Sequence, residues 1–403
     1  MRIIHTSDWH LGKNLEGMSR LDEQELFVDF FVQKCEELKP DLILLAGDVY
    51  DTSNPPARAE KLFYDALKKL SREGECLTLV IAGNHDNPER LVSATPLAME
   101  HGIVMLGTPK SIVELGDYGK HRVIDSGEGF VEVKIREEHA VIVAVPYPSE
   151  KRLNEVFYRD DEEEDARAAS YGEKIAALFG ELEKHFREDC INLTVSHLFV
   201  QGSEAAGSER ASSLGGSFMV SSDALPKKAD YTALGHIHKP QILPKTDKKM
   251  RYSGSPIHYH LSEPKSNKKF YIIDIKAGEE AIIDEVEIPI FKPIELWQMK
   301  SVEEAIEYAE EHRDDNSWVY IEIKTSRTIK EDEIKKLKSL KKDILEIRPD
   351  IHSLASQRDL HRINELSFEE QFIEFYKSQR DVEPEKEMVE LLMSILEGED
   401  ETD

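Results

Sequence analysis

The sequence LILLAGD at residues 42–48 decides the fold, because five apolar residues run without interruption into a glycine and an aspartate. The same form returns at residues 77–84, LTLVIAGN, and a first short strand at residues 3–7 is expected to end at Asp8. Continuous apolar runs are typical of strands covered on both faces, as in parallel sheets with helical crossovers. Apolar positions at helical spacing over residues 21–39 predict the first crossover helix. We therefore expect an α/β fold.

Polar clusters follow the apolar runs, at the point where each predicted strand ends. In an open α/β sheet, ligands bind outside the carboxyl ends of the strands, so the clusters mark the expected site. Together they offer carboxylate, imidazole and amide groups, which a two-metal phosphoesterase site needs. The clusters are DWH (8–10), GD (47–48), GNHD (83–86), SH (196–197), GHIH (235–238) and GSP (254–256).

Two pairs of the expected ligands are spaced two residues apart, Asp8 with His10 and His236 with His238. On extended backbone such pairs project to the same side, where they can chelate one ion. Asp48 is expected to bridge two cations, because a carboxylate has two oxygens. Mixed nitrogen and oxygen ligands without a thiolate favour two Mn²⁺ ions, with Fe, Zn or Co as alternatives. The predicted metal ligands are Asp8, His10, Asp48, Asn84, His197, His236 and His238.

Other residues of these clusters are expected to act on the substrate or to shape the site. His85 is predicted to protonate the leaving oxygen or to stabilise charge on the phosphorane, since imidazole titrates near neutral pH. The alternative is that His85 only caps the turn before Asp86. Asp86 is expected to orient His85 or its loop. Ser255, His258 and His260 lie in or just after the GSP cluster, and they are candidate substrate contacts.

The charge of the chain is uneven. The formal net charge is −28 at pH 7, although phosphate binding normally calls for Lys and Arg. Much of the acid lies at residues 155–165 and 397–403, whereas residues 239–269 have a local balance of +6. This basic segment directly follows His238, and it forms either a basic wall beside the metal site or a solvated loop. Two divalent ions would also add positive charge where a phosphate binds.

The remaining composition bounds the class of protein. The three cysteines are widely spaced, so buried thiols are expected rather than a zinc or redox pair. No run of about 18 apolar residues occurs, so we expect a cytoplasmic protein with no membrane contact. Residues 202–217 are rich in Gly, Ser and Ala and predict a mobile loop on the substrate side.

The length of 403 residues exceeds one hydrophobic core, so several units are expected. The predicted catalytic unit spans residues 1–290. Residues 291–350 predict a small α+β domain, in which Ser301 and Glu304 have the form of a capping box. Residues 351–365 are polar and predict a linker. Residues 366–403 predict amphipathic helices that dock into a partner, or alternatively fold back on the body.

These motifs resemble the SbcD family of nuclease subunits, within the calcineurin-like metallophosphoesterase superfamily. The likeness covers essentially the whole chain. The superfamily would be indicated by the metal ligands alone, and the form DWHLG, the Ser-Pro motif and the two C-terminal extensions narrow it to this family. The motifs that carry it are HTSDWHLG (5–12), AGDVYDT (46–52), AGNHD (82–86), ALGHIH (233–238) and YSGSP (252–256).

The resemblance implies the assignment of ligands to ions. One manganese would be held by Asp8, His10, Asp48 and His238, and the other by Asp48, Asn84, His197 and His236. His85 would be the catalytic histidine. At position 51 archaeal and eukaryotic relatives carry a second histidine, whereas this chain has Asp51, as bacterial relatives do. We expect Asp51 to shape the site rather than to act as an acid.

The resemblance also implies a four-layer αββα catalytic domain, a capping domain and a C-terminal segment that binds the coiled coil of the ATPase SbcC. The expected activity is manganese-dependent 3′ to 5′ exonuclease action on duplex DNA ends and endonuclease action on single strands and hairpins. The expected partners are SbcC, DNA and a second SbcD subunit in a homodimer. ATP would be hydrolysed by SbcC, because this chain has no Gly-rich phosphate loop.

Two alternatives remain open at the level of sequence. One is a phosphoesterase of the same superfamily that acts on small substrates, although such an enzyme needs neither a cap nor a partner-binding tail. The other is a non-catalytic scaffold with the phosphoesterase fold, although a scaffold would be expected to have lost ligands.

Overall fold

The computed structural model describes residues 1–153, 164–209, 219–263, 267–325, 327–350 and 367–380, together with the single positions 384, 386, 388, 389 and 392. The chain divides into two compact units. The first comprises Met1–Glu295 with Asn316–Trp318, and the second comprises Leu296–Asp315 with Val319–Asp403. All the predicted metal ligands lie in the first unit.

A six-stranded sheet in the order β16-β15-β1-β4-β5-β6 contains the strands predicted from the apolar runs. Strands β1, β4 and β5 are mutually parallel, as predicted, and β6, which was not predicted, continues them in parallel. The sheet is nevertheless mixed, because β15 pairs antiparallel with β1 and carries β16 on its outer edge. The strands are β1 (Arg2–Thr6), β4 (Leu42–Leu45), β5 (Leu77–Ile81), β6 (Ile103–Leu106), β15 (Lys269–Asp274) and β16 (Ile282–Glu287).

An eight-stranded sheet in the order β13-β14-β12-β11-β10-β9-β8-β7 forms the other half of this unit. The apolar runs at residues 141–145, 191–195 and 231–234 also predict strands, and β10, β11 and β12 lie there as parallel neighbours at the centre of this sheet. The antiparallel strands β7 to β9 were not predicted. The strands are β7 (Gly116–Tyr118), β8 (His121–Gly127), β9 (Phe130–Ile135), β10 (Glu138–Val145), β11 (Ile191–His197), β12 (Tyr231–Gly235), β13 (Gln241–Ile242) and β14 (Met250–Tyr252).

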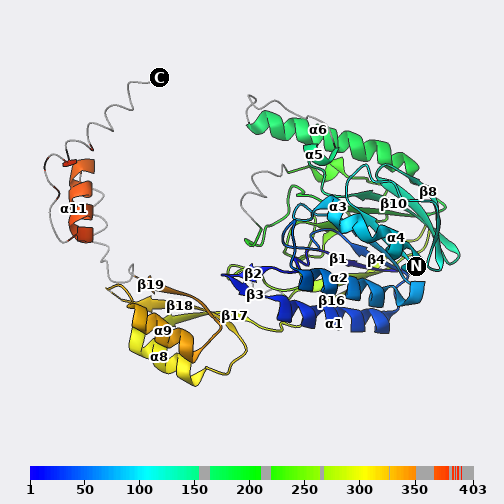
Figure 1. Ribbon diagram of the computed structural model, residues 1–403. Coiled ribbons are helices and arrows are strands. Elements are labelled where there is room, and N and C mark those ends of the chain that lie inside the picture. Colours follow the sequence, from blue (N-terminus) through cyan, green and yellow to red (C-terminus); the bar gives the residue numbers. More distant parts are fainter. Residues whose placement is uncertain are drawn as a thin grey trace. The chain divides into compact units, whose positions relative to one another are not determined.

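Helices cover the outer face of each sheet, with α1 and α2 on one side and α6 on the other (Figure 1). Helix α1 ends before Pro40, as predicted, with Lys39 left-handed at φ 51°. A short ribbon of β2 (Asn14–Leu15) and β3 (Met18–Ser19) follows the first strand. The helices are α1 (Leu21–Leu38), α2 (Ala57–Leu70), α3 (Pro88–Leu91), α4 (Thr95–Ala98), α5 (Glu150–Leu153) and α6 (Glu164–Leu182). Single 3₁₀ turns are η1 (Arg72–Gly74), η2 (Val92–Ala94), η3 (Met99–His101), η4 (Glu183–His185) and η5 (Ser222–Ala224).

Strand β4 shows why the apolar run is uninterrupted. Leu42 and Leu44 belong to the core between the two sheets, whereas Ile43 and Leu45 pack into the core beneath α1 and α2. A third core lies between the eight-stranded sheet and α6, which contributes Ile175. Because successive side chains of a strand point to opposite faces, every position of β4 is buried. Three cores between four layers confirm the expected αββα sandwich.

The second unit is built on a three-stranded sheet in the order β17-β18-β19. Its helices pack over this sheet around a core that includes Ala305, Ile321 and Leu337. The Ser301 hydroxyl accepts from the Glu304 amide at 3.2 Å, as the capping-box pattern predicts. The elements are β17 (Ile294–Met299), α8 (Val302–Glu311), β18 (Trp318–Lys324), α9 (Glu331–Leu340) and β19 (Ile344–Asp350).

Helix α11 (Phe368–Arg380) begins after Ser367, which together with Glu370 has the same capping-box form as Ser301 with Glu304. The Glu370 amide donates to the Ser367 hydroxyl at 3.3 Å, and the Ser367 amide donates to the Glu370 carboxylate at 2.7 Å. The predicted linker at 351–365 lies outside the described residues, as does most of the predicted second helix after Pro384. Within the described part of the chain, no helix has the length and apolar character needed to span a bilayer.

Candidate metal centre

The loop after β1 carries Asp8 and His10 in a conformation that the residue spacing does not predict. Extended backbone was expected, but both residues are left-handed, with φ of 53° and 44°. Such a conformation costs an L-residue roughly 1–2 kcal/mol. The Asp8 amide donates to the Gly47 carbonyl and the His10 amide to the Asp48 carbonyl, each at 3.0 Å. The two ligands therefore converge because the neighbouring loop holds a tight turn, and not because strand residues alternate.

The loops after β4 and β5 bring Asp48, Asn84 and His85 to the same edge. Asp48 is also left-handed, with φ 50°, and its carboxylate accepts from the His85 amide at 2.9 Å. Gly47 is required because a Cβ there would lie 2.4 Å from the His197 Nδ1 atom. Gly47 thus allows the two sheets to approach closely at the site, and Gly83 leaves room for Asp48 of the neighbouring loop.

The eight-stranded sheet supplies the three remaining histidines. His197 is the last residue of β11, and His236 and His238 follow β12. The His197 ring donates from Nδ1 to the Ala46 carbonyl at 2.8 Å, which leaves Nε2 directed into the site. A metal-binding histidine commonly donates its other ring nitrogen in this way.

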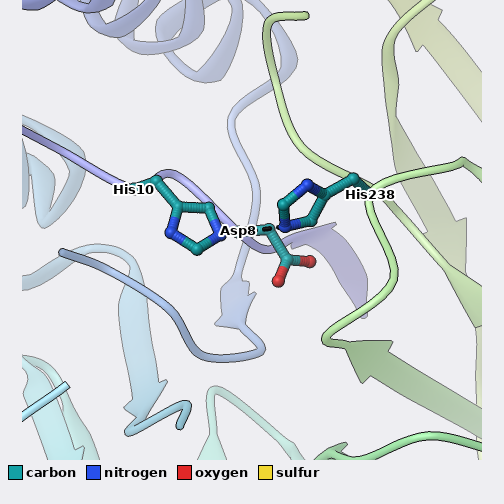
Figure 2. A group of neighbouring side chains, drawn as sticks. All are labelled: Asp8, His10 and His238. Atoms are coloured by element: carbon teal, nitrogen blue, oxygen red, sulfur yellow. Dashed lines mark hydrogen bonds between the residues drawn. The ribbon is translucent and has the colours of Figure 1, made fainter. Parts of the chain in front are cut away.

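All seven predicted ligands come together. His10 and His197 approach the Asp48 Oδ2 atom to 3.5 and 3.4 Å, so Asp48 lies between them. Figure 2 shows the rings of His10 and His238 directed toward each other beside the Asp8 carboxylate, with their Nε2 atoms 2.9 Å apart. On the other side of Asp48, the Asn84 Oδ1 atom is 2.9 Å from His197 Nε2 and 3.0 Å from His236 Nδ1.

The electrostatics of this cluster suit a bound cation. Burial lowers the pKa of His10 to about 4 and that of His236 to about 3, so both rings are neutral and able to act as ligands at pH 7. Burial also opposes charge on His197, but Asp48 and Asp8 outweigh it and raise its pKa to about 9. The buried Nε2 of His236 has no hydrogen-bond partner among the described residues. Divalent cations would satisfy these atoms, so the residues present fit a metal centre.

His85 lies beside the cluster, with its side chain 8% exposed. Its Nδ1 donates to the Asp51 carbonyl at 2.8 Å, and its Nε2 lies 3.9 Å from the Asp48 Oδ2 atom. The Asp51 side chain pairs with Lys13 at 2.8 Å and lies 3.4 Å from the His10 Nδ1 atom. Although burial opposes it, contact with His10 and Lys13 lowers the pKa of Asp51 to about 2. Asp51 therefore carries its charge beside the rings of His10 and His85.

Asp86 joins two loops. Its carboxylate accepts from the amides of Val49, Tyr50 and Gly83 at 3.1, 2.9 and 2.8 Å. Burial, followed by the charge of Asp48, raises its pKa to about 6. Of the two roles predicted for Asp86, the structure places its side chain to hold the loop rather than the His85 ring.

Arg152 is a site residue that sequence reasoning missed. Its guanidinium donates to the carbonyls of Gly83 and Asp86, both at 2.7 Å, and it lies over the Tyr147 ring. It thereby holds the loop of Asn84 and His85 from the side of α5. No local pattern marks it, because Arg152 lies about 70 residues from the carbonyls that it contacts.

Of the three candidate substrate contacts, Ser255 adjoins the ligand cluster, because its amide donates to the His238 carbonyl at 3.1 Å. Ser255 is fully buried, donates to the Ile257 carbonyl at 3.0 Å and accepts from Lys268 at 2.8 Å. The His258 carbonyl accepts from Arg20 at 2.9 Å. His260 is exposed, and its Nδ1 lies 2.5 Å from the Ser262 hydroxyl. A role of these residues in substrate binding stays a prediction.

The lysines that precede β14 do not form a wall beside the metal centre. Strand β14 runs parallel to β12, so residues that precede β14 lie at the opposite edge of the sheet from His236. Lys248 and Lys249 accordingly line a surface cavity with Asp230, which precedes β12. Lys268 is buried against Glu263. Lys248 and Lys249 therefore fit the alternative of a solvated loop, whereas Lys268 adjoins the ligand cluster by donating to the His238 carbonyl at 3.1 Å.

Part of the Gly/Ser-rich loop is attached to a metal ligand. The Glu209 carboxylate accepts from the amides of Ala206, Gly207 and His238 at 2.8–3.0 Å. The Ser208 hydroxyl lies 2.6 Å from the His238 Nδ1 atom. Residues 210–218, which the expected mobile loop includes, lie outside the described residues.

Comparison with known proteins supports the chemistry of this centre. Residues 1–240 match the family described as calcineurin-like phosphoesterase, and residues 290–380 match the type 5 capsule protein repressor C-terminal domain. The chain is 38% identical over 405 residues to the SbcD subunit of the nuclease SbcCD from Bacillus subtilis (strain 168), with 100% of both chains covered. A calcineurin-like phosphoesterase domain with this donor cluster supports binding of divalent metal.

Two solved structures share a low overall likeness. A Thermus thermophilus protein matches 72% of this chain and 99% of its own at 13% identity, with a TM-score of 0.34. A dimetal phosphatase from Danio rerio matches 72% of this chain and 98% of its own at 11% identity, also with a TM-score of 0.34. The assignment rests instead on the family match and on the full-length relative. The chain belongs to the calcineurin-like phosphoesterases and, within them, to the SbcD family of nuclease subunits.

Proposed function

We propose that this chain is a manganese-dependent nuclease that hydrolyses DNA phosphodiesters, with 3′ to 5′ exonuclease activity on duplex ends and endonuclease activity on single strands and hairpins. The observation that carries the proposal is the convergence of seven nitrogen and oxygen ligands around Asp48 in a full-length relative of a nuclease subunit. A centre of this kind suits in-line attack on phosphorus.

Two manganese ions are assigned to this centre. Asp8, His10, Asp48 and His238 would hold one, and Asp48, Asn84, His197 and His236 the other. The central place of Asp48, close to both His10 and His197, supports its role as the shared ligand. When bound, the ions supply charge neutralisation for the phosphate and activation of a water molecule.

His85 is assigned as the proton donor to the leaving oxygen. Because its Nδ1 donates to the Asp51 carbonyl, the ring orientation is set and Nε2 lies on the side of the ligands. Nε2 can give a proton to the leaving oxygen when the ring carries both protons, and the ring then returns to the neutral form with its proton on Nδ1. Asp86 and Arg152 hold the loop that carries His85, from two sides. Asp51 shapes the site through Lys13 and His10.

The partner assignments concern the parts of the chain beyond the metal centre. Residues 291–350 would act as a capping domain, and residues 366–403, after a linker at 351–365, would bind the coiled coil of SbcC. SbcC would also supply ATP hydrolysis. The full-length likeness to a subunit of SbcCD supports this assembly. Deletion of residues 366–403 should abolish SbcC binding while manganese-dependent cleavage of single strands remains; loss of both would show that the tail belongs to the catalytic core.

A homodimer is also proposed, through the helical region after Asn87. Helix α4 and the loop after β6 expose large apolar side chains there, with Leu97 at 75%, Ile112 at 63% and Leu115 at 62% exposure. Exposed apolar side chains of this kind are typical of interaction surfaces. Sedimentation of Leu97→Glu, compared with the wild type, would test this interface.

The decisive test compares three substrates under manganese. Purified wild-type protein, His85→Ala and the control His101→Ala, which changes an exposed histidine outside the site, would each receive end-labelled duplex DNA, single-stranded DNA and bis-p-nitrophenyl phosphate. We expect cleavage of both DNAs by the wild type and the control, and a loss of about 10²–10⁴-fold in His85→Ala, the usual contribution of a general acid.

Other outcomes separate the alternatives. Hydrolysis of the small diester with intact DNA would favour a small-substrate phosphoesterase. Absence of any metal-dependent hydrolysis, with no metal bound by the purified protein, would favour a non-catalytic scaffold. Equal cleavage by His85→Ala and His101→Ala would remove His85 from the chemistry while leaving the nuclease assignment in place.

A further inference from the structure

The loop Trp9–Gly12, which carries the ligand His10, is held on two sides. On one side the amides of His10 and Leu11 donate to the carbonyls of Asp48 and Val49 at 3.0 and 2.9 Å. On the other side the carbonyls of Trp9 and His10 point toward helix α1 and Tyr259. His10 is left-handed, and such a residue persists only where its surroundings determine it.

Gln24 contacts this loop with both ends of its amide. Its Oε1 accepts from the Gly12 amide at 2.9 Å, and its Nε2 donates to the His10 carbonyl at 2.7 Å. The side chain is fully buried in the first turn of α1. Only a residue with a donor and an acceptor on one short planar group makes both bonds. Gln24 thus fixes the backbone on each side of Leu11.

Tyr259 acts on the same loop and on the ligands directly. Its hydroxyl accepts from Gln24 Nε2 at 3.1 Å and donates to the Trp9 carbonyl at 2.5 Å. Its ring lies edge-on to His10, with centroids 5.6 Å apart, and to His238, with centroids 6.1 Å apart. It is 3% exposed, so this contact with two imidazoles is fully enclosed.

We propose that Gln24 and Tyr259 are positioning residues of the metal centre, which set the place of His10 relative to His238 and thereby the affinity of one of its two ions. The proposal rests on the proposed two-metal function. Neither residue contacts a reacting atom, and both act through the backbone of residues 9–12 or through the ligand rings. Partners outside the ligand set commonly contribute 10–100-fold to metal affinity.

The test measures manganese binding directly, by the electron paramagnetic resonance signal of free Mn²⁺ during titration. Tyr259→Phe keeps the ring and removes only the hydroxyl, and Gln24→Met keeps the approximate length and removes both hydrogen bonds. We expect the wild type to bind two ions. In each variant one ion should bind about 10-fold or more weakly, and the other should be unchanged.

Two matched controls separate positioning from general loss of stability. Tyr231→Phe removes a buried hydroxyl that contacts His5 at 2.9 Å, between the sheets. Asn192→Leu removes a buried side-chain amide at the start of β11. This amide accepts from the backbone N–H of Arg187 and donates to the backbone carbonyl of Arg187. Both controls should lose thermal stability to a similar extent and still bind two ions with wild-type affinity. Excess manganese should restore DNA cleavage to Tyr259→Phe.

The outcomes distinguish this inference from the proposed function. A wild type that binds no manganese would refute the metal centre itself, and the positioning role with it. A wild type with two ions, but with equal affinity in Tyr259→Phe and Gln24→Met, would overturn the positioning role alone. Equal weakening in the two controls would also overturn it, because the effect would then follow general stability.

Discussion

Replacement of Gly83 by alanine should disable the metal centre, because the new methyl group would displace the carboxylate of Asp48. A Cβ at this position would lie 2.1 Å from the Asp48 Oδ1 atom, 2.3 Å from the Asp48 amide nitrogen and 2.7 Å from its Cγ atom. Non-bonded atoms prefer separations near 3.5 Å, so the Asp48 carboxylate must move by roughly 1 Å. The backbone of Asp48 cannot yield easily, because its own carbonyl binds the His10 amide.

The expected magnitude follows from two known effects. Overpacking of a filled interior costs about 1–3 kcal/mol. The free energy of unfolding of Gly83→Ala, measured by urea denaturation, should therefore be lower than that of the wild type by this amount. A misplacement of about 1 Å at a catalytic centre costs on the order of 10²-fold in rate. Because we propose Asp48 as the ligand shared by both ions, we expect weakened binding of both ions and a loss of that order in manganese-dependent cleavage of labelled single-stranded DNA.

The matched control is the same substitution at Gly180, in α6. A Cβ there meets no atom within 4 Å, so the variant should gain about 0.5–1 kcal/mol, as alanine does over glycine inside a helix, with unchanged cleavage. Wild-type cleavage and two tightly bound ions in Gly83→Ala would refute the reasoning, since Asp48 would then tolerate the displacement.

Further predictions address charge, burial and metal. Manganese binding at pH 7.5 should release a proton from His197, whose pKa is about 9 without metal, so the affinity for manganese should rise as the pH rises toward 9. Titration calorimetry in two buffers of different ionisation enthalpy measures the number of protons released. Binding without proton release would contradict the prediction. Glu23→Ala should cost about 3–5 kcal/mol in urea unfolding, because the buried Arg20 loses its carboxylate, whereas Lys61→Ala, from an exposed pair, should change stability by less than about 0.5 kcal/mol. Removal of metal with EDTA should lower the melting temperature, and manganese at about 100 times its Kd should restore about 2.7 kcal/mol. Arg152→Ala should reduce the cleavage rate about 10-fold with two ions still bound, since only the loop of Asn84 and His85 loses its support; loss of the ions would show that Arg152 supports the ligands instead.

Local patterns were sufficient for the layers of the first unit. The run at β4 is uninterrupted because alternate residues face two different cores, so every position must be apolar. A strand that is buried on both faces can therefore be predicted from its sequence alone. Helix α1 was predicted within a residue, since its apolar period ends at Pro40. Strands β7 to β9 were missed. They extend the sheet beyond the parallel strands, and only β9 pairs with the central strand β10.

The sequence by itself determined which side chains are available to a metal and that they follow strands, because donor chemistry and hydrophobic period are local properties. Only the tertiary structure decided how they meet. Asp8 and His10 converge through left-handed turns held by the loop at Gly47, and not through the extended backbone that their spacing suggested. The contacts of Gln24 and Tyr259 with the loop of His10, and the position of the lysines before β14, were not predictable from the sequence either. Contacts between distant parts of the chain depend on packing, which no local period encodes.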